Sequence, residues 1–110
     1  MFINLTPHQI DEQKSGLSIP STGIARIKVA SKLVTIVDGV DIYYSDYIGQ
    51  LEGLPEPVEG VIYIVSALAL NAVPAERNDV VAPGDAVRDA SGRVIGCKGF
   101  RCRNEMFNVI

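Results

Sequence analysis

The sequence predicts a mainly β protein, either a small antiparallel barrel or a sandwich of hairpins, with one short helix at about residues 67–73. Three observations predict this class. Turn-forming residues recur about every eight to twelve positions, which is typical of all-β domains. Two segments carry the signature of a hairpin, and only one segment is rich in good helix formers. The chain has 110 residues, so we expect residues 1–110 to form one domain.

The first part of the chain predicts three strands separated by turns. Residues 2–5 are mostly apolar, and Thr6-Pro7 ends that strand because proline has no N–H to donate. Residues 17–19 form a second short strand. From Ala25 to Val29, apolar and basic residues alternate, as a strand with one buried face requires.

The dipeptide Asp38-Gly39 predicts a hairpin between residues 33–37 and 40–44. Both turn residues tolerate positive φ, which a two-residue turn needs in order to match the twist of its strands. The expected register pairs Val37 with Val40, Thr35 with Ile42, and Leu33 with Tyr44. Tyr43 and Tyr44 then point to opposite faces, so we expect one in the core and the other exposed.

Residues 61–65 are continuously β-branched or aromatic, which predicts a central strand buried on both faces. Ser66 is a favourable N-cap for a short helix over residues 67–73, and Pro74 ends that helix. Val80-Val81 predicts a brief strand that stops at a Pro83-Gly84 turn.

A second hairpin is predicted around Asp89–Gly92, between residues 86–88 and 93–95. The four connecting residues suit a type I turn with Gly92 in the left-handed conformation. Sequential strands are therefore expected to pair as antiparallel hairpins.

The net charge of −3 conceals an uneven distribution. Residues 1–92 carry 12 acidic and 6 basic side chains, a balance of −6, whereas residues 93–110 have a balance of +3. An acidic domain is a poor partner for duplex DNA, because neutralising phosphates needs a basic face. The short cationic segment can still hold one small anion, or it is simply a solvated charged terminus.

No apolar stretch approaches the roughly 20 residues of a membrane helix, and the N-terminus lacks the pattern of a secretory signal. We therefore expect a cytoplasmic protein with no membrane partner. Cys97 and Cys102 lack the two-residue gap of a redox dithiol. Two reduced thiols are expected, with a disulfide or a metal as the alternatives.

No catalytic or cofactor motif is recognisable. His8 is the only histidine, and a nucleophile needs both a base and a group that orients the base. There is no Walker loop and no dinucleotide fingerprint. We expect a binding protein with no enzymatic activity, cofactor or metal. A small hydrolase that uses His8 with Cys97 or a carboxylate is the alternative.

Phe100 lies among Lys98, Arg101 and Arg103, a combination of ring and cations that nucleotide recognition uses. The polar Arg77-Asn78 turn is a second candidate, and His8 either fixes a loop or lines a pocket. The predicted ligand-binding residues are Arg77, Asn78, Lys98, Phe100, Arg101, Arg103 and His8. The simpler interpretation is that the rings pack in the core and the cations are solvated.

Residues 106–110 are apolar apart from Asn108. Such a segment would expose its side chains unless it packs on its own sheet or against a second subunit. We therefore expect a homo-oligomer.

Four blocks of the sequence resemble a group of small phage, prophage and bacterial proteins. The blocks are Asn4-Leu5-Thr6-Pro7-His8, Gly53-Leu54-Pro55, residues 60–66, and residues 87–97 with the gap at 90–91. In size and β-rich pattern the chain also resembles the Thoeris anti-defence proteins of phages. That resemblance implies an oligomeric sponge that captures cyclic ADP-ribose-type signals near subunit interfaces without cleaving them. It assigns no binding residue in this chain.

The leading hypothesis is a phage-type anti-defence protein that sequesters a small anionic, nucleotide-like signal. The alternative is an inhibitor or regulatory module, similar to an anti-CRISPR factor, whose acidic surface docks on a host protein.

Overall fold

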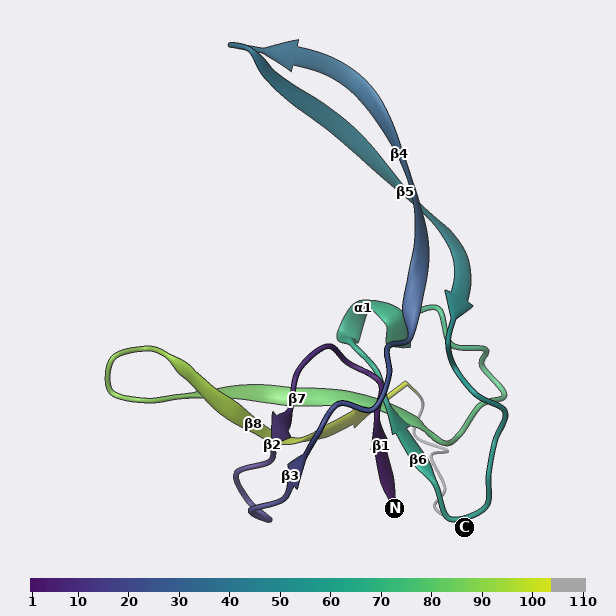
Figure 1. Cartoon of the computed structure of the whole chain (residues 1–110), viewed down its shortest axis with the longest axis vertical. Helices are drawn as coiled ribbons and strands as arrows, with labels where there is room; N and C mark the ends of the chain where they lie inside the picture. Colours follow the sequence, from purple (N-terminus) through teal and green to yellow (C-terminus); the bar gives the residue numbers. More distant parts are fainter. Residues whose placement is uncertain (104–110) are drawn as a thin grey trace.

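The structure, a computed structural model, describes residues 1–103, and for residues 47–50 it describes the backbone alone. Strands dominate this part of the chain, with one short helix (Figure 1). The elements are β1 (Phe2–Asn4), β2 (Ile10–Asp11), β3 (Ser18–Ile19), β4 (Arg26–Val37), β5 (Val40–Glu52), β6 (Ile62–Ile64), α1 (Ala67–Leu70), β7 (Val80–Arg88) and β8 (Val94–Cys102).

The described strands form three separate sheets. One has four strands in the order β1-β6-β7-β8, and the pairs β2-β3 and β4-β5 form two-stranded antiparallel sheets. In the four-stranded sheet β7 and β8 are antiparallel, but β1-β6 and β6-β7 are parallel. The mainly β class with antiparallel hairpins is confirmed. Among the described strands no barrel closes, so the barrel prediction is wrong, and the sandwich of hairpins is not confirmed.

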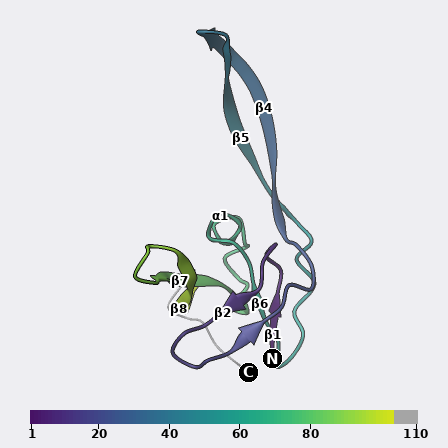
Figure 2. The same cartoon turned by 60° about the vertical axis from the view of Figure 1, so that its left-hand side comes forward.

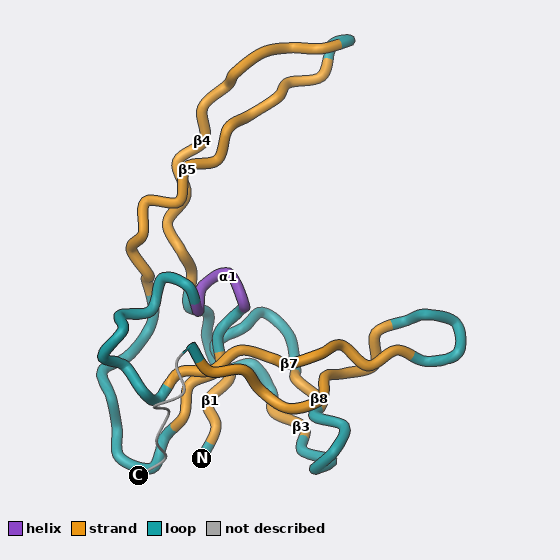
Figure 3. The backbone as a smooth tube through the Cα atoms, turned by 180° about the vertical axis from the view of Figure 1, so that it is seen from behind, coloured by secondary structure: helices purple, strands orange, loops and turns teal. Residues whose placement is uncertain are grey.

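The core lies on both faces of β6, as the unbroken apolar run 61–65 predicted. Tyr63 and Val65 belong to one buried cluster that includes Ala69 and Leu70 of the helix. Ile62 and Ile64 face a second cluster, which includes Ile10 of β2 and Ile19 of β3. Period-two alternation along one strand thus fills two apolar layers. Figure 3 shows the strands of the sheet from behind, with α1 on one side.

The helix α1 is shorter than predicted. The Ser66 hydroxyl accepts a hydrogen bond from the Ala69 N–H at 3.2 Å, so the predicted N-cap is confirmed. The helix ends at Leu70 rather than at residue 73, and residues 71–73 form a turn that includes Val73 in the core. The helix covers this face of β6 together with Leu5, Ala25 and Val73.

The hairpin β4–β5 forms a long arm that projects away from the rest of the molecule (Figures 1 and 2). Asp38 and Gly39 both have positive φ, at 52° and 78°, as the two-residue turn requires. The predicted pairs Val37–Val40 and Thr35–Ile42 are confirmed. The third pair is wrong, because a register shift lies between Leu33 and Thr35 and places Leu33 opposite Tyr43.

The arm makes the molecule extended. Its radius of gyration is 16.4 Å, against roughly 13 Å for a compact chain of this length. Tyr43 and Tyr44 are 57% and 60% exposed. The expectation that one of them lies in the core is wrong, because the part of the arm that carries them projects away from the four-stranded sheet (Figure 1).

The second hairpin, β7–β8, has the predicted turn. Gly92 has a φ of 85°, and the Asp89 carboxylate accepts hydrogen bonds from the N–H groups of Ser91 and Arg93. The predicted Pro83-Gly84 turn is wrong, because both residues lie inside β7. Pro83 lies past Val81, the last residue of β7 that pairs with β6, so its missing N–H leaves no β6 carbonyl unsatisfied.

In the part of the chain that the structure describes, no helix is both long enough and apolar enough to cross a membrane. Residues 106–110, which were predicted to support self-association, lie outside the described residues.

Candidate functional site

The β7–β8 hairpin is a cationic element in an acidic protein. Residues 80–103 carry five basic and two acidic side chains, a balance of +3, so the remainder of the chain has a balance of −6. Lys98, Arg101 and Arg103, three of the predicted site residues, are all exposed on or just after β8. Because these cations are exposed, an anion can reach them directly from solvent.

Arg101 forms an ion pair with Asp85 on the neighbouring strand. The side chains are 63% and 80% exposed, so water competes with this pair and its contribution to stability is small. A guanidinium has five N–H donors, so the pair leaves Arg101 able to contact a second anion.

Phe100 does not present a free ring. It packs edge-on against Phe2 of β1, with ring centroids 5.1 Å apart and an interplanar angle of 60°. Both rings are half-buried and pack against the cluster around Ile64. Phe100 therefore anchors β8 to the core, and the simpler interpretation of this ring describes its packing better than base stacking does.

A cavity of about 320 Å³ lies between β2 and the β7–β8 hairpin. Its wall from the hairpin includes Ala86, Val94 and Ile95, and its wall from β2 includes Ile10 and Asp11. The cavity was not predicted from the sequence, because its walls meet only when the N-terminal segment lies alongside β8 in the fold. The signal for it in the sequence was a glycine in each strand of the hairpin.

Gly84 and Gly96 line the cavity and permit close approach of backbone to backbone. A Cβ on Gly96 would collide with the Asp11 carbonyl oxygen, and one on Gly84 would collide with the Lys98 carbonyl oxygen. Glycine inside a strand often marks such a contact. Gly96 thus lets β8 contact the β2 segment, and Gly84 lets β7 lie close to β8, so both residues shape the cavity.

Glu12 fixes the same junction from the other side. Its carboxylate is buried and accepts hydrogen bonds from the N–H groups of Gly99, at 2.7 Å, and Ser15, at 2.6 Å. The hydrogen bond from Gly99, followed by that from Ser15, lowers the pKa of Glu12 from its ordinary value of 4.5 to about 2. At neutral pH Glu12 is ionised, and each of its carboxylate oxygens accepts a backbone hydrogen bond, so its role is to position the hairpin.

Cys97 lines the cavity floor as a buried, free thiol, and Cys102 is free and exposed. The structure joins the two cysteines by no disulfide, and their reduced state stays a prediction. Burial raises the pKa of the Cys97 thiol. A protonated thiol is a poor nucleophile at neutral pH, so the hydrolase alternative gains no activated cysteine from this position.

Arg77 is held by its neighbours. Its guanidinium binds both oxygens of Asp79 at 2.9 Å and donates to the Pro55 carbonyl at 3.0 Å. The hydrogen bond with Asp79 raises the pKa of Arg77. This arrangement ties the 55–60 connection to the start of β7, so the clearest role of Arg77 is structural.

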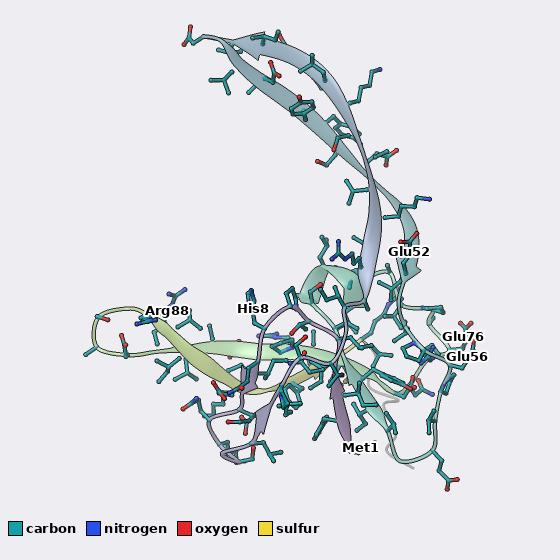
Figure 4. All side chains as sticks on the ribbon, viewed as in Figure 1. Met1, His8, Glu52, Glu56, Glu76 and Arg88 are labelled. Carbon is teal, nitrogen blue, oxygen red and sulfur yellow. The ribbon has the colours of Figure 1, made fainter. Side chains whose placement is uncertain are left out.

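Arg77 and the exposed Asn78 line a second cavity, of about 290 Å³, between the 57–62 segment and the 76–79 turn. Glu59, Glu76 and Asp79 also line it, so its carboxylates outnumber its one guanidinium. Figure 4 shows Glu56 and Glu76 together on this side of the molecule and Arg88 on the opposite side. The negative balance disfavours a phosphate group here.

His8 has an exposed side chain, and its backbone is what the fold uses. The fully buried Asn4 amide donates to the carbonyls of His8, at 2.8 Å, and Ile19, at 2.9 Å, and accepts from the Thr6 N–H and hydroxyl. The Asn-Leu-Thr-Pro-His block is therefore a hydrogen-bonded turn. In Figure 4, His8 lies on the side of the core away from Glu56 and Glu76.

The seven predicted site residues thus fall into three places. Lys98, Phe100, Arg101 and Arg103 share β8 and its end. Arg77 and Asn78 lie just before β7, whose residue Val81 pairs with Cys102. His8 lies in the turn between β1 and β2.

Within residues 1–103, no group of three or more His, Cys, Asp or Glu side chains is placed to hold a metal ion. No family model, no curated protein and no solved structure matches this chain.

Proposed function

We propose that the protein binds a small anionic, nucleotide-like ligand at the β7–β8 hairpin and holds it without cleaving it. The observation that supports this proposal is the juxtaposition of the cationic hairpin and the cavity beside β2. The hairpin has a balance of +3 in a chain of net charge −3. The cavity of about 320 Å³ lies directly against it.

The two parts suit the two ends of such a ligand. Arginine binds phosphate oxygens through paired N–H donors. Arg101, Arg103 and Lys98 are exposed, so a phosphate group can reach them. The cavity has aliphatic walls from Ile10, Val94 and Ile95, which suit the flat face of a base. Its volume is near the lower end of the range for small-molecule sites, roughly 300–1,000 Å³.

Retention without turnover is part of the proposal. The titratable groups of this cavity are Asp11 and Cys97. Hydrogen bonds from Ser18 and Gln9 lower the pKa of Asp11, which makes it a weak base at neutral pH. Burial keeps Cys97 protonated. Neither group is poised as a general acid or a nucleophile.

The test is isothermal titration calorimetry together with native mass spectrometry, using ADP-ribose and cyclic ADP-ribose isomers as probes. We expect at least one probe to be retained at its original mass. Removing two charge-assisted contacts in Arg101→Ala/Arg103→Ala should weaken its binding by about 100-fold or more. Lys14→Ala, which removes an exposed cation from another loop, is the control and should leave affinity unchanged.

A second variant tests the cavity itself. Ala86 is exposed and lines the cavity, so Ala86→Leu should fill part of it without disturbing the core. Ala90→Leu, in the exposed hairpin turn, is the matched control. We expect only Ala86→Leu to reduce affinity. Failure to retain any probe would overturn the proposal and favour the alternative of an acidic surface that docks on a host protein, which a pull-down would then test.

A further inference from the structure

The β4–β5 arm exposes large apolar side chains on both of its faces. Val34, Tyr43 and Tyr44 are each more than half exposed. The exposed large apolar residues of the arm are Val29, Leu33, Val34, Ile36, Val37, Val40, Ile42, Tyr43 and Tyr44. Contiguous apolar surface of this kind marks an interaction site more often than a solvated face.

The arm has little support from the rest of the chain. Among the described residues it is a two-stranded sheet, so no described strand pairs with the outer backbone edge of β4 or of β5. The arm meets the rest of the described chain at its base, where β4 contacts α1 and Leu51 of β5 packs against the core (Figure 2). An isolated two-stranded ribbon is marginally stable in water, and open edges are sites of further strand pairing.

Charge is segregated between the two strands. The charged residues of β4 are Arg26, Lys28 and Lys32, all basic, and those of β5 are Asp41, Asp46 and Glu52, all acidic. Arg26 and Glu52 are the only two charged residues of the arm that lie directly opposite each other across its strands. Each copy of the chain therefore presents one basic edge and one acidic edge.

We propose that the arms of identical copies stand side by side, with the outer edge of β4 in one copy paired to the outer edge of β5 in the next, in a closed ring of three or more copies. When the arms point the same way, β4 of one copy runs antiparallel to β5 of its neighbour. Such pairing places the basic side chains of β4 beside the acidic side chains of β5 in the next copy. In a closed ring it leaves no edge of any arm unpaired.

The alternative two-fold arrangements are disfavoured by the same charges. Pairing β4 with a second β4 would set three cations against three, and pairing β5 with β5 would set three carboxylates against three. Like charges opposite each other across strands are destabilising. The interface is therefore heterologous, and the assembly closes by rotational symmetry of order three or higher.

The experiment measures the mass of the particle in solution by light scattering after size exclusion and by native mass spectrometry. We expect the wild-type chain to form one discrete oligomer of three or more copies. Lys28→Glu/Lys32→Glu gives an arm with two acidic edges, and Asp41→Lys/Asp46→Lys gives one with two basic edges. Each should be monomeric, because either change sets like charges against each other.

Two rescue measurements keep the test independent of folding. A 1:1 mixture of the two variants should restore an oligomer with an even number of copies, in which the two variants alternate. The single chain that carries all four substitutions exchanges the two edges and should also assemble. Lys14→Glu/Lys98→Glu, outside the arm, is the control for total charge and should leave the oligomer unchanged.

A wild-type monomer or dimer would overturn the proposal, as would a four-substitution chain that folds by circular dichroism but stays monomeric. A monomer that is captured by a different protein would assign the arm to that protein instead. The arm and the proposed ligand site are different elements, so a monomer that still binds the nucleotide probes would overturn this inference and leave the proposed function standing.

Discussion

The Glu12 carboxylate accepts a hydrogen bond from the Gly99 N–H, which lies 87 residues later in the chain, at 2.7 Å. The same carboxylate accepts from the Ser15 N–H, so one buried side chain closes a local turn and fastens that turn to β8. The β7–β8 hairpin and the cavity beside it are held in place by this contact.

The stability of the fold should therefore depend on the charge of Glu12. Its pKa is lowered from 4.5 to about 2 by the Gly99 and Ser15 hydrogen bonds. A carboxylate with a depressed pKa contributes its stabilisation fully above pH 4.5 and loses it as the pH falls through about 2. Thermal unfolding between pH 7 and pH 2 should show this loss, and Glu12→Gln should lower stability at pH 7 and flatten the profile. A profile in Glu12→Gln as steep as that of Glu59→Gln would contradict the assignment.

Substitution of Asn4 should destabilise the protein by about 2–4 kcal/mol, because it leaves buried carbonyls and an N–H without partners. The Asn4 amide uses both of its donors and accepts two hydrogen bonds. Asn4→Asp is as informative as Asn4→Ala, since an aspartate cannot donate to the His8 and Ile19 carbonyls. Urea unfolding measures the change, with the exposed Asn71→Ala as control. A loss below about 0.5 kcal/mol for Asn4→Asp would refute the role of the turn.

The two ion pairs should differ in strength. Arg77 and Asp79 are 14% and 18% exposed and share two hydrogen bonds, so a double-mutant cycle should give a coupling energy of about 1–3 kcal/mol. Arg101 and Asp85 are largely exposed, and their cycle should give less than about 1 kcal/mol. Equal coupling in the two cycles would show that burial does not set the difference.

Gly96→Ala should separate β2 from β8, because its new methyl group meets the Asp11 carbonyl. Hydrogen exchange of the Gln13 N–H, which donates to the Cys97 carbonyl at 2.8 Å, should become faster. Gly92→Ala is the control, because Gly92 has open space around it and a φ of 85°, so the substitution should cost only about 1–2 kcal/mol of stability. Once exchange through global unfolding is taken into account, it should leave the exchange rate of the Gln13 N–H unchanged. Protection of the Gln13 N–H in Gly96→Ala equal to that in Gly92→Ala would count against the contact.

The local rules predicted what is decided locally. The Asp38-Gly39 and Asp89–Gly92 turns, the Ser66 cap and the strand at Ile62–Ile64 all follow from neighbouring residues. The parallel pairing of β1 with β6 was not predicted, because strand partners that are far apart leave no periodic signal in the sequence. Pro83-Gly84 suggested a turn because proline is rare inside strands. It is tolerated in β7 because the strand continues beyond its last pair with β6, and that arrangement depends on the topology of the sheet.

The candidate site shows the same division. The cationic composition of β8 was evident from the sequence, and Lys98, Arg101 and Arg103 are exposed as a binding surface requires. The packing of Phe100 on Phe2 and the pairing of Arg77 with Asp79 depend on contacts that composition cannot reveal. Exposure of both Tyr43 and Tyr44 was missed because alternation assigns faces without saying whether the molecule has anything to cover them.

The place of the arm within the chain bears on how the protein folds during synthesis. β1 has no partner in the four-stranded sheet until β6, about sixty residues later, has left the ribosome, and such distant pairing is intrinsically slow. The arm forms from its own turn outward and brings Arg26 beside Glu52, so it removes residues 27–51, nearly half of the intervening chain, from the loop that must close. We infer that the hairpin folds early, and that the sheet is completed across a connection shorter than the sequence suggests.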